Sequence, residues 1–174
     1  PIVVGGGHNN CFPLLKALSN SRKTRVAAVN IDAHSDLRSL EGRHSGNGFS
    51  YALEKGFMSH YQVLGLQNAY TSEDIFQRMN LEEHFEYVLF EDLLVDSKYP
   101  IWTYASRFLK RMHNLDIPVG IELDVDSIAN FPSSASSPIG FELNTILKTL
   151  DYLGNNHHTA YLHICEAAPS LGWD

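Results

Sequence analysis

Short runs of apolar residues alternate along the chain with longer segments whose apolar positions recur at helical spacing. This alternation is typical of a parallel sheet covered by helices on both faces. It predicts strands at Ile2–Val4, Arg25–Ile31, Tyr61–Leu66, Glu86–Phe90, Pro118–Leu123 and Thr159–Ile164. It predicts helices at Phe12–Ser19, Phe49–Lys55, Ser72–Met79, Trp102–Asn114 and Glu142–Leu153. We therefore expect an α/β fold with three layers, α/β/α, around a mostly parallel sheet.

The length of the chain suits one domain. Its 174 residues, 44% of them hydrophobic, can bury a substantial core, and the sequence contains no repeat and no linker-like segment. We expect a single α/β domain spanning residues 1–174. Because the first predicted strand follows Pro1 directly, without an initiator Met, we expect this domain to be incomplete at the N-terminus. We expect it to be incomplete at the C-terminus as well.

Charge and cysteine content exclude several classes of protein. The chain has 13 Lys and Arg against 20 Asp and Glu, a formal net charge of −7, and no basic patch interleaved with aromatic residues, so we expect no nucleic-acid partner. No apolar run approaches the roughly 18 residues of a membrane span. The two cysteines, Cys11 and Cys165, form no disulfide framework. A cytoplasmic protein without membrane contact is the expectation.

Three short motifs carry candidate metal chemistry, and each follows a predicted strand: Gly5-Gly6-Gly7-His8, Asp32-Ala33-His34-Ser35-Asp36 and Asp124-Val125-Asp126. In open α/β sheets, ligands bind at the carboxyl ends of the strands, so these motifs should meet at one edge. Four carboxylates converging there would repel each other unless cations compensated them. The oxygen and imidazole donors suit two hard divalent ions. The candidate ligands are His8, Asp32, His34, Asp36, Asp124 and Asp126.

Each motif alone has a simpler explanation. A histidine after glycines is often a turn residue, and Asp-x-Asp at a strand end is often a helix cap or an Asx turn. The joint occurrence of all three motifs favours the metal site. The polar segment 130–138 is interpreted as an active-site loop, with an ordinary surface connection as the alternative.

These motifs resemble those of the ureohydrolases, the family of arginases, agmatinases and formimidoylglutamases. The resemblance runs from Val3 to Pro169 and implies an arginase-like fold. Within the family, the chain is most similar to the formimidoylglutamase branch, because of Gly7 where arginases and agmatinases usually have Asp, the stretch Asp36-Leu37-Arg38, and His44-Ser45-Gly46 followed by Phe49.

The resemblance implies two Mn²⁺ ions per subunit. It assigns His8, Asp32, Asp36 and Asp124 to one ion, and Asp32, His34, Asp124 and Asp126 to the other, so that Asp32 and Asp124 bridge both. A water activated between the ions would attack the trigonal carbon of an amidine or guanidine. Asp36 is the candidate for carrying its proton to the departing nitrogen.

The resemblance also points to residues that would contact the substrate. Glu166, at the end of the last predicted strand, would face the metals and bind a cationic amidinium group, the alternative being a surface glutamate. Arg38, with the hydroxyls of Ser133, Ser134 and Ser137, would bind a substrate carboxylate, although Arg38 could equally pair with the acidic cluster. His44 is a candidate general acid or substrate contact, shifted by one position from the family pattern; a solvated loop histidine is the alternative. Further substrate contacts are expected at Ser45 and Asn47.

The expected function is a binuclear manganese hydrolase that acts on the C–N bond of a linear amidine. The first choice is conversion of N-formimino-L-glutamate, in histidine degradation, to L-glutamate and formamide. One alternative is an arginase- or agmatinase-type hydrolase of a guanidino group, releasing urea. A second is a non-catalytic, metal-binding relative that acts as a scaffold. A zinc deacetylase is a weaker alternative, since it would need a single metal. The family commonly forms trimers or hexamers, so a homo-oligomer is expected.

Overall fold

The computed structural model describes residues 1–95 and 99–172, and in these ranges six strands form one parallel sheet. The strands are β1 (Ile2–Val4), β2 (Val26–Ile31), β3 (Met58–Leu66), β4 (Phe85–Leu89), β5 (Val119–Asp124) and β6 (Thr159–Cys165), in the order β1-β6-β5-β2-β3-β4. The predicted α/β architecture is confirmed, and the sheet in these ranges is parallel throughout.

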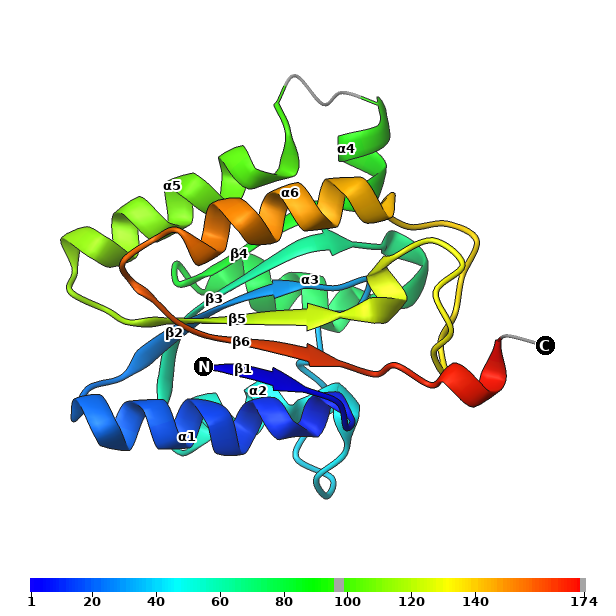
Figure 1. Ribbon diagram of the computed structural model, residues 1–174. Helices are drawn as coiled ribbons and strands as arrows, with labels where there is room; N and C mark the ends of the chain where they lie inside the picture. The colour runs from blue at the N-terminus through cyan, green and yellow to red at the C-terminus, as the bar shows by residue number, and fades with distance from the viewer. Residues whose placement is uncertain (96–98, 173–174) are drawn as a thin grey trace.

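Two layers of helices cover the sheet (Figure 1). One core cluster joins a face of the sheet to α4 (Phe90–Val95), α5 (Ile101–Asn114) and α6 (Leu143–Gly154). The other cluster joins the opposite face to α1 (Cys11–Arg22), α2 (Gly48–Glu54) and α3 (Glu73–Leu81). The alternation of side chains along a strand produces this division, because Val29 and Ile31 of β2 enter the first core while Val26 and Ala28 enter the second.

The largest differences from the sequence prediction are at three elements, of which one is α1, which continues to Arg22 rather than ending at Ser19. Helix α4 was not predicted, since its six residues directly continue the apolar run of β4 and leave no turn signal between them. Strand β3 begins at Met58 rather than Tyr61, because Met58 pairs with Val26 although polar Ser59 and His60 follow it. No helix in residues 1–95 and 99–172 is long and apolar enough to cross a membrane.

The order of the strands creates a crevice at the carboxyl edge of the sheet. From β2 the chain proceeds outward through β3 to β4, and then crosses back to β5 and β6 on the other side of β2. Neighbouring strands β2 and β5 therefore mark the position at which the direction of winding reverses. Ligands bind at such a switch point in open α/β sheets. Asp32 directly follows β2, and Asp124 is the last residue of β5.

Candidate metal centre

The motif residues lie at or just after the carboxyl ends of three strands, β1, β2 and β5, and the last two of these flank the switch point. His8 begins a 3₁₀ turn, His8–Asn10, shortly after β1. Asp32 and Asp124 lie at the ends of neighbouring strands, because Ile31 of β2 pairs with Leu123 of β5. Asp126 lies in the 3₁₀ turn Val125–Ser127 that follows β5. The fold thus brings three separate segments to one buried point.

A first group of ligand atoms surrounds the imidazole of His8. Its Nδ1 lies 2.8 Å from Asp36 Oδ2, 3.2 Å from Asp124 Oδ2 and 3.3 Å from Asp32 Oδ2. All four residues are buried, and their ligand atoms lie within 4.8 Å of one another. The thiol of Cys165 lies within the same reach of His8 and Asp124.

A second group surrounds His34, which is partly exposed. His34 Nδ1 lies 3.2 Å from Asp126 Oδ2 and 3.4 Å from Asp32 Oδ1. Asp32 therefore belongs to both groups, with Oδ2 toward His8 and Oδ1 toward His34. Asp124 falls in the group of His8, and its second oxygen, Oδ1, accepts a hydrogen bond from the backbone N–H of Asp126 at 3.0 Å.

Sequence reasoning missed the residues that hold Asp32 in place. Asn30 Nδ2 donates to Asp32 Oδ2 at 2.8 Å and to the hydroxyl of Tyr61 at 3.0 Å, and the Tyr61 hydroxyl donates to the backbone oxygen of Ser35 at 2.8 Å. The signal was present in the sequence, because Asn30 is the single polar residue of β2 and lies two positions before Asp32, hence on the same side of the strand.

The carboxylates of the cluster are close together and buried, so they raise one another's pKa values where no positive charge offsets their repulsion. Burial, together with the charge of Asp32, raises the pKa of Asp36 to about 6 and raises that of Asp124 well above its usual range. Burial alone would lower the pKa of His34, but hydrogen bonds to Asp126 and Asp32 outweigh it and raise this pKa to about 11. Burial would also lower the pKa of His8, but hydrogen bonds to the surrounding carboxylates outweigh this effect and raise the pKa well above its ordinary value.

The donor set fits divalent metal ions. Nδ1 of His8 and Oδ1 of Asp126 are buried without a hydrogen-bond partner among residues 1–95 and 99–172, although Nδ1 lies among three carboxylate oxygens. A buried polar atom without a partner is costly, and a cation bound by Nδ1 and these carboxylates would remove that cost for His8. Carboxylate and imidazole donors suit Mn²⁺ and related first-row ions.

A cavity of about 410 Å³ opens above the cluster and is lined by Asp36, Asp124, Asp126 and Glu166 among others. Glu166 follows β6 and accepts a hydrogen bond from the backbone N–H of His8 through Oε1, at 2.6 Å. Asp36 and Glu166 both have a positive φ, +50° and +63°, which is strained for residues other than glycine. Such strain persists where surrounding contacts fix the conformation, and it is enriched at functional sites.

The predicted substrate contacts occupy different depths around this cavity. Arg38, His44 and Ser45 line it, together with Ser134 from the polar loop. The ring of His44 is already engaged by its own loop, because Nδ1 accepts from the N–H of Gly46 and Nε2 lies 3.1 Å from Glu41 Oε1. Asn47 is fully buried beneath the loop and donates to the backbone oxygens of Ser39 and Gly42. Roles in substrate binding or catalysis for these residues stay predictions.

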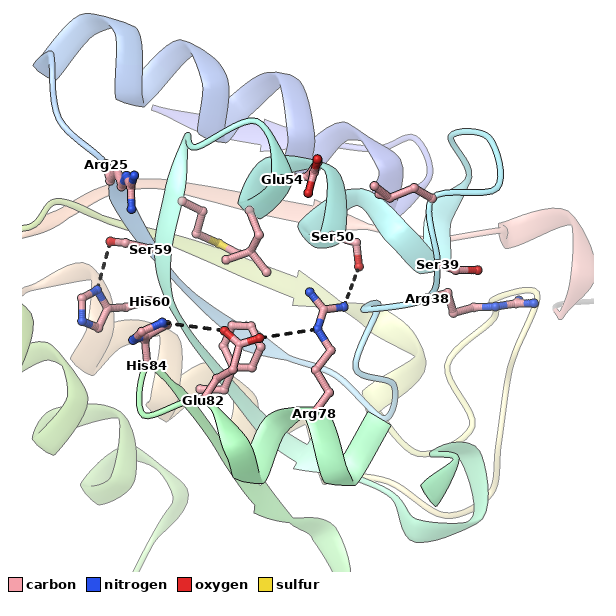
Figure 2. A pocket seen from close by; sticks show the side chains of 14 residues that line it. Arg25, Arg38, Ser39, Ser50, Glu54, Ser59, His60, Arg78, Glu82 and His84 are labelled. Carbon is pink, nitrogen blue, oxygen red and sulfur yellow. Dashed lines mark hydrogen bonds and ion pairs between the residues drawn. The ribbon is translucent and has the colours of Figure 1, made fainter. Parts of the chain in front are cut away.

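A larger cavity, about 720 Å³, lies away from the cluster and shares Arg38 with the first (Figure 2). Arg78 crosses it and donates to the hydroxyl of Ser50 and to the backbone oxygen of Leu37, which follows Asp36. Figure 2 shows Arg38 at the margin, with its side chain extended away from Arg78. This cavity contains none of the six candidate metal ligands.

Comparison with known proteins agrees with this geometry. A family model described as the arginase family matches residues 1–174. The chain is 30% identical over 177 residues to a formimidoylglutamase of Halalkalibacterium halodurans, covering 98% of this chain and 54% of that protein. It is 29% identical to a formimidoylglutamase of Rhodococcus jostii, covering 100% and 56%. The chain thus spans about half the length of these curated relatives.

Solved structures show the same fold. Formimidoylglutamase from Bacillus subtilis superposes with a TM-score of 0.89 at 19% identity, covering 99% of this chain and 55% of that one. Trypanosoma cruzi formiminoglutamase with Mn²⁺ superposes with a TM-score of 0.81 at 20% identity, covering 98% and 58%. At these identities the likeness establishes the fold.

Proposed function

The chain belongs to the arginase family, and from this premise we propose that it forms part of a hydrolase that cleaves the C–N bond of a linear amidine. The proposed substrate is N-formimino-L-glutamate, and the products are L-glutamate and formamide. The formimidoylglutamases among the relatives support this choice.

One observation carries the proposal: the two oxygens of Asp32 face two different histidines beneath a cavity whose wall includes Glu166. We assign two Mn²⁺ ions to this centre, one held by His8, Asp36 and Asp124 and the other by His34 and Asp126, with Asp32 shared. The Mn²⁺ bound to a T. cruzi relative supports the choice of metal. When bound, such a pair of ions polarises the substrate and lowers the pKa of a water molecule.

Glu166 binds the positive charge of the substrate. Its Oε1 is fixed by the N–H of His8, and Oε2 has no hydrogen-bond partner within residues 1–95 and 99–172. An amidinium group presents N–H donors and a positive charge, so it forms charge-assisted hydrogen bonds with this carboxylate. The contact orients the trigonal carbon toward the aspartates on the opposite wall.

Asp36 moves the proton. Its carboxylate lies on the cavity wall beside His8, where it accepts a proton from the attacking water and delivers it to the departing nitrogen. Water forms the new C–O bond, the C–N bond breaks, and the departing nitrogen takes up the proton, so no covalent enzyme intermediate is needed. His44, at the rim, is the second candidate for the proton donor.

The far end of the cavity binds the carboxylates of a glutamate derivative. Arg38 offers a guanidinium there that is 68% exposed and lies 3.6 Å from Glu41 Oε1, so a substrate carboxylate would share it with Glu41, and Ser134 offers a hydroxyl. Gly7 keeps the space beside Glu166 free, because a Cβ at this position would lie 3.2 Å from Glu166 Oε1. A larger residue at position 7 would crowd the amidinium end of the substrate.

The proposal includes a compartment and an assembly. Both cysteines, Cys11 and Cys165, are free and buried, which suits a reducing compartment such as the cytoplasm. By resemblance the subunits form a trimer or hexamer, and light scattering of the purified full-length protein tests this.

The function is tested with the full-length protein loaded with Mn²⁺. N-formimino-L-glutamate, agmatine and arginine are supplied separately, and formamide and urea are measured. Formamide from the first substrate alone supports the proposal. Urea from either of the others identifies a guanidino hydrolase, and two bound ions without turnover of any amidine identify a non-catalytic relative.

A further inference from the structure

A buried polar ladder runs along β5 and β6 toward the metal centre. The register pairs Gly120 with Tyr161, Glu122 with His163, and Asp124 with Cys165, so these side chains share one face of the sheet. Glu122 and His163 are fully buried, and Tyr161 is nearly so. The last pair, Asp124 and Cys165, contributes atoms to the candidate ligand groups that include His8.

Glu122 has partners for both of its oxygens. The hydroxyl of Tyr161 donates to Oε1 at 2.5 Å, and Nδ1 of His163 lies 2.6 Å from Oε2. Gly120 makes the first contact possible, since a Cβ there would collide with the ring of Tyr161. A buried carboxylate is tolerated only when it is paired and hydrogen-bonded, so this arrangement fixes Glu122 in one position.

The imidazole of His8 lies between Glu122 and the aspartates. Its Nδ1 faces Asp32, Asp36 and Asp124, whereas its Nε2 faces Glu122 Oε2 at 3.7 Å. The ring of Phe49 packs against it edge to face, with centroids 5.1 Å apart. His163 also reaches the loop before His8, because its Nε2 lies 3.4 Å from the backbone oxygen of Gly5.

We propose that Glu122 is a positioning residue for His8: its carboxylate, 3.7 Å from Nε2, favours the ring form with the proton on Nε2 and so leaves the Nδ1 lone pair for the metal ion. The inference rests on the proposed metal centre. A histidine that binds a metal through one nitrogen needs an acceptor for the proton on the other, and a carboxylate there strengthens the ligand. Tyr161 and His163 hold Glu122 in the orientation that this contact requires.

The test measures Mn²⁺ binding to the full-length protein by titration calorimetry, for the native sequence and for Glu122→Gln. Removing the carboxylate should weaken the ion held by His8 about 10- to 100-fold, the range for lost partners of metal-binding histidines. The ion held by His34 should keep its affinity. Tyr161→Phe is the matched control, because it removes a bond to Oε1 and leaves Oε2 facing His8, so its effect on either ion should be smaller.

A structural role alone predicts a different result: a lower melting temperature with both affinities unchanged, or equal losses at both ions. Either outcome overturns the inference. If the native protein binds two ions and hydrolyses the amidine while Glu122→Gln binds both ions normally, the inference fails and the proposed function stands. If the native protein binds no Mn²⁺, the proposed metal centre itself fails.

A second readout needs no variant. In Zn²⁺-loaded protein labelled with ¹⁵N-histidine, His8 should show the proton on Nε2 and the metal on Nδ1. Coordination through Nε2, with the proton on Nδ1, would contradict the proposal even if Glu122→Gln did not fold.

Discussion

The backbone N–H of His8 donates a hydrogen bond of 2.6 Å to Oε1 of Glu166, joining the turn after the first strand to the residue that follows the last strand. The two residues are 158 positions apart. One contact therefore links a candidate metal ligand to the candidate substrate-binding carboxylate. It also fixes one oxygen of Glu166, a residue that lines the cavity beside the cluster.

Glu166→Gln separates charge from position. The glutamine can still accept the bond from His8, so Mn²⁺ content should stay at the native value. The loss of the charge-assisted bonds should lower kcat/KM for a cationic amidine about 10- to 100-fold, corresponding to about 1.5–3 kcal/mol. Steady-state kinetics and metal analysis of the same preparation measure both effects.

Glu166→Ala serves as the comparison for that variant. It removes the acceptor for His8 as well, so it should lower both kcat/KM and the affinity for the ion that His8 holds. If the glutamine variant lost metal to the same extent, the separate role of Glu166 in substrate binding would be untenable.

Asp32→Asn and Asp126→Asn should differ in metal content. Asp32 faces both histidines, so its replacement should weaken both ions, whereas Asp126 lies only with His34 and its replacement should weaken one. Elemental analysis after dialysis against a fixed Mn²⁺ concentration distinguishes the two. Two tightly bound ions in Asp32→Asn would show that this carboxylate is not shared.

Mn²⁺ should stabilise the protein strongly, because it neutralises four crowded carboxylates. At a free concentration about 100 times the dissociation constant, one site contributes about 2.7 kcal/mol to the free energy of unfolding. Thermal unfolding with Mn²⁺, and again after a chelator, measures the shift.

Asp36→Asn should stabilise the metal-free protein but reduce the stabilisation that Mn²⁺ provides. Without added metal, one fewer negative charge in the cluster should raise the melting temperature. Because the variant lacks a metal ligand, adding Mn²⁺ should raise its melting temperature by less than it raises that of the native protein. A fall in the melting temperature of the metal-free variant would contradict the repulsion argument.

His60, in the larger cavity, should titrate at an unusually low pH. Burial, with the positive charges of Arg111 and His84, lowers its pKa below the ordinary value. The folded state thus disfavours the protonated ring, so this contribution to stability is present above the unfolded pKa and is lost as pH falls through the folded one. NMR titration of the His60 ring, compared with Arg111→Met, checks the cause: the variant should titrate at higher pH.

The sequence predicted the sheet and the six candidate ligands because both depend on local pattern. Strand ends are visible where apolar runs stop, and parallel strands place those ends at one edge. The division of the ligands was less visible. Asp32 and Asp124 occupy equivalent places in the sequence motifs, and Oδ1 of each accepts a hydrogen bond from the backbone N–H two residues on. Oδ1 of Asp32 also lies 3.4 Å from Nδ1 of His34, a contact that depends on how the segments after β2 and β5 pack and that no spacing reveals.

Residues that support the ligands from other strands were harder to predict. The contact of Glu122 with Tyr161 and His163 depends on the register between β5 and β6 and on the small side chain of Gly120. Register between strands far apart in sequence is set by packing. The alternation of Glu122, Asp124 and Asp126 was the one available signal, since residues two apart share a face of a strand.

The most direct test of the account is a crystal structure of the full-length protein grown with Mn²⁺, with anomalous scattering measured at the manganese absorption edge. The account predicts two anomalous peaks in each subunit, one beside His8, Asp36 and Asp124 and the other beside His34 and Asp126, with Asp32 between them. A single peak, or none, at saturating Mn²⁺ would contradict it.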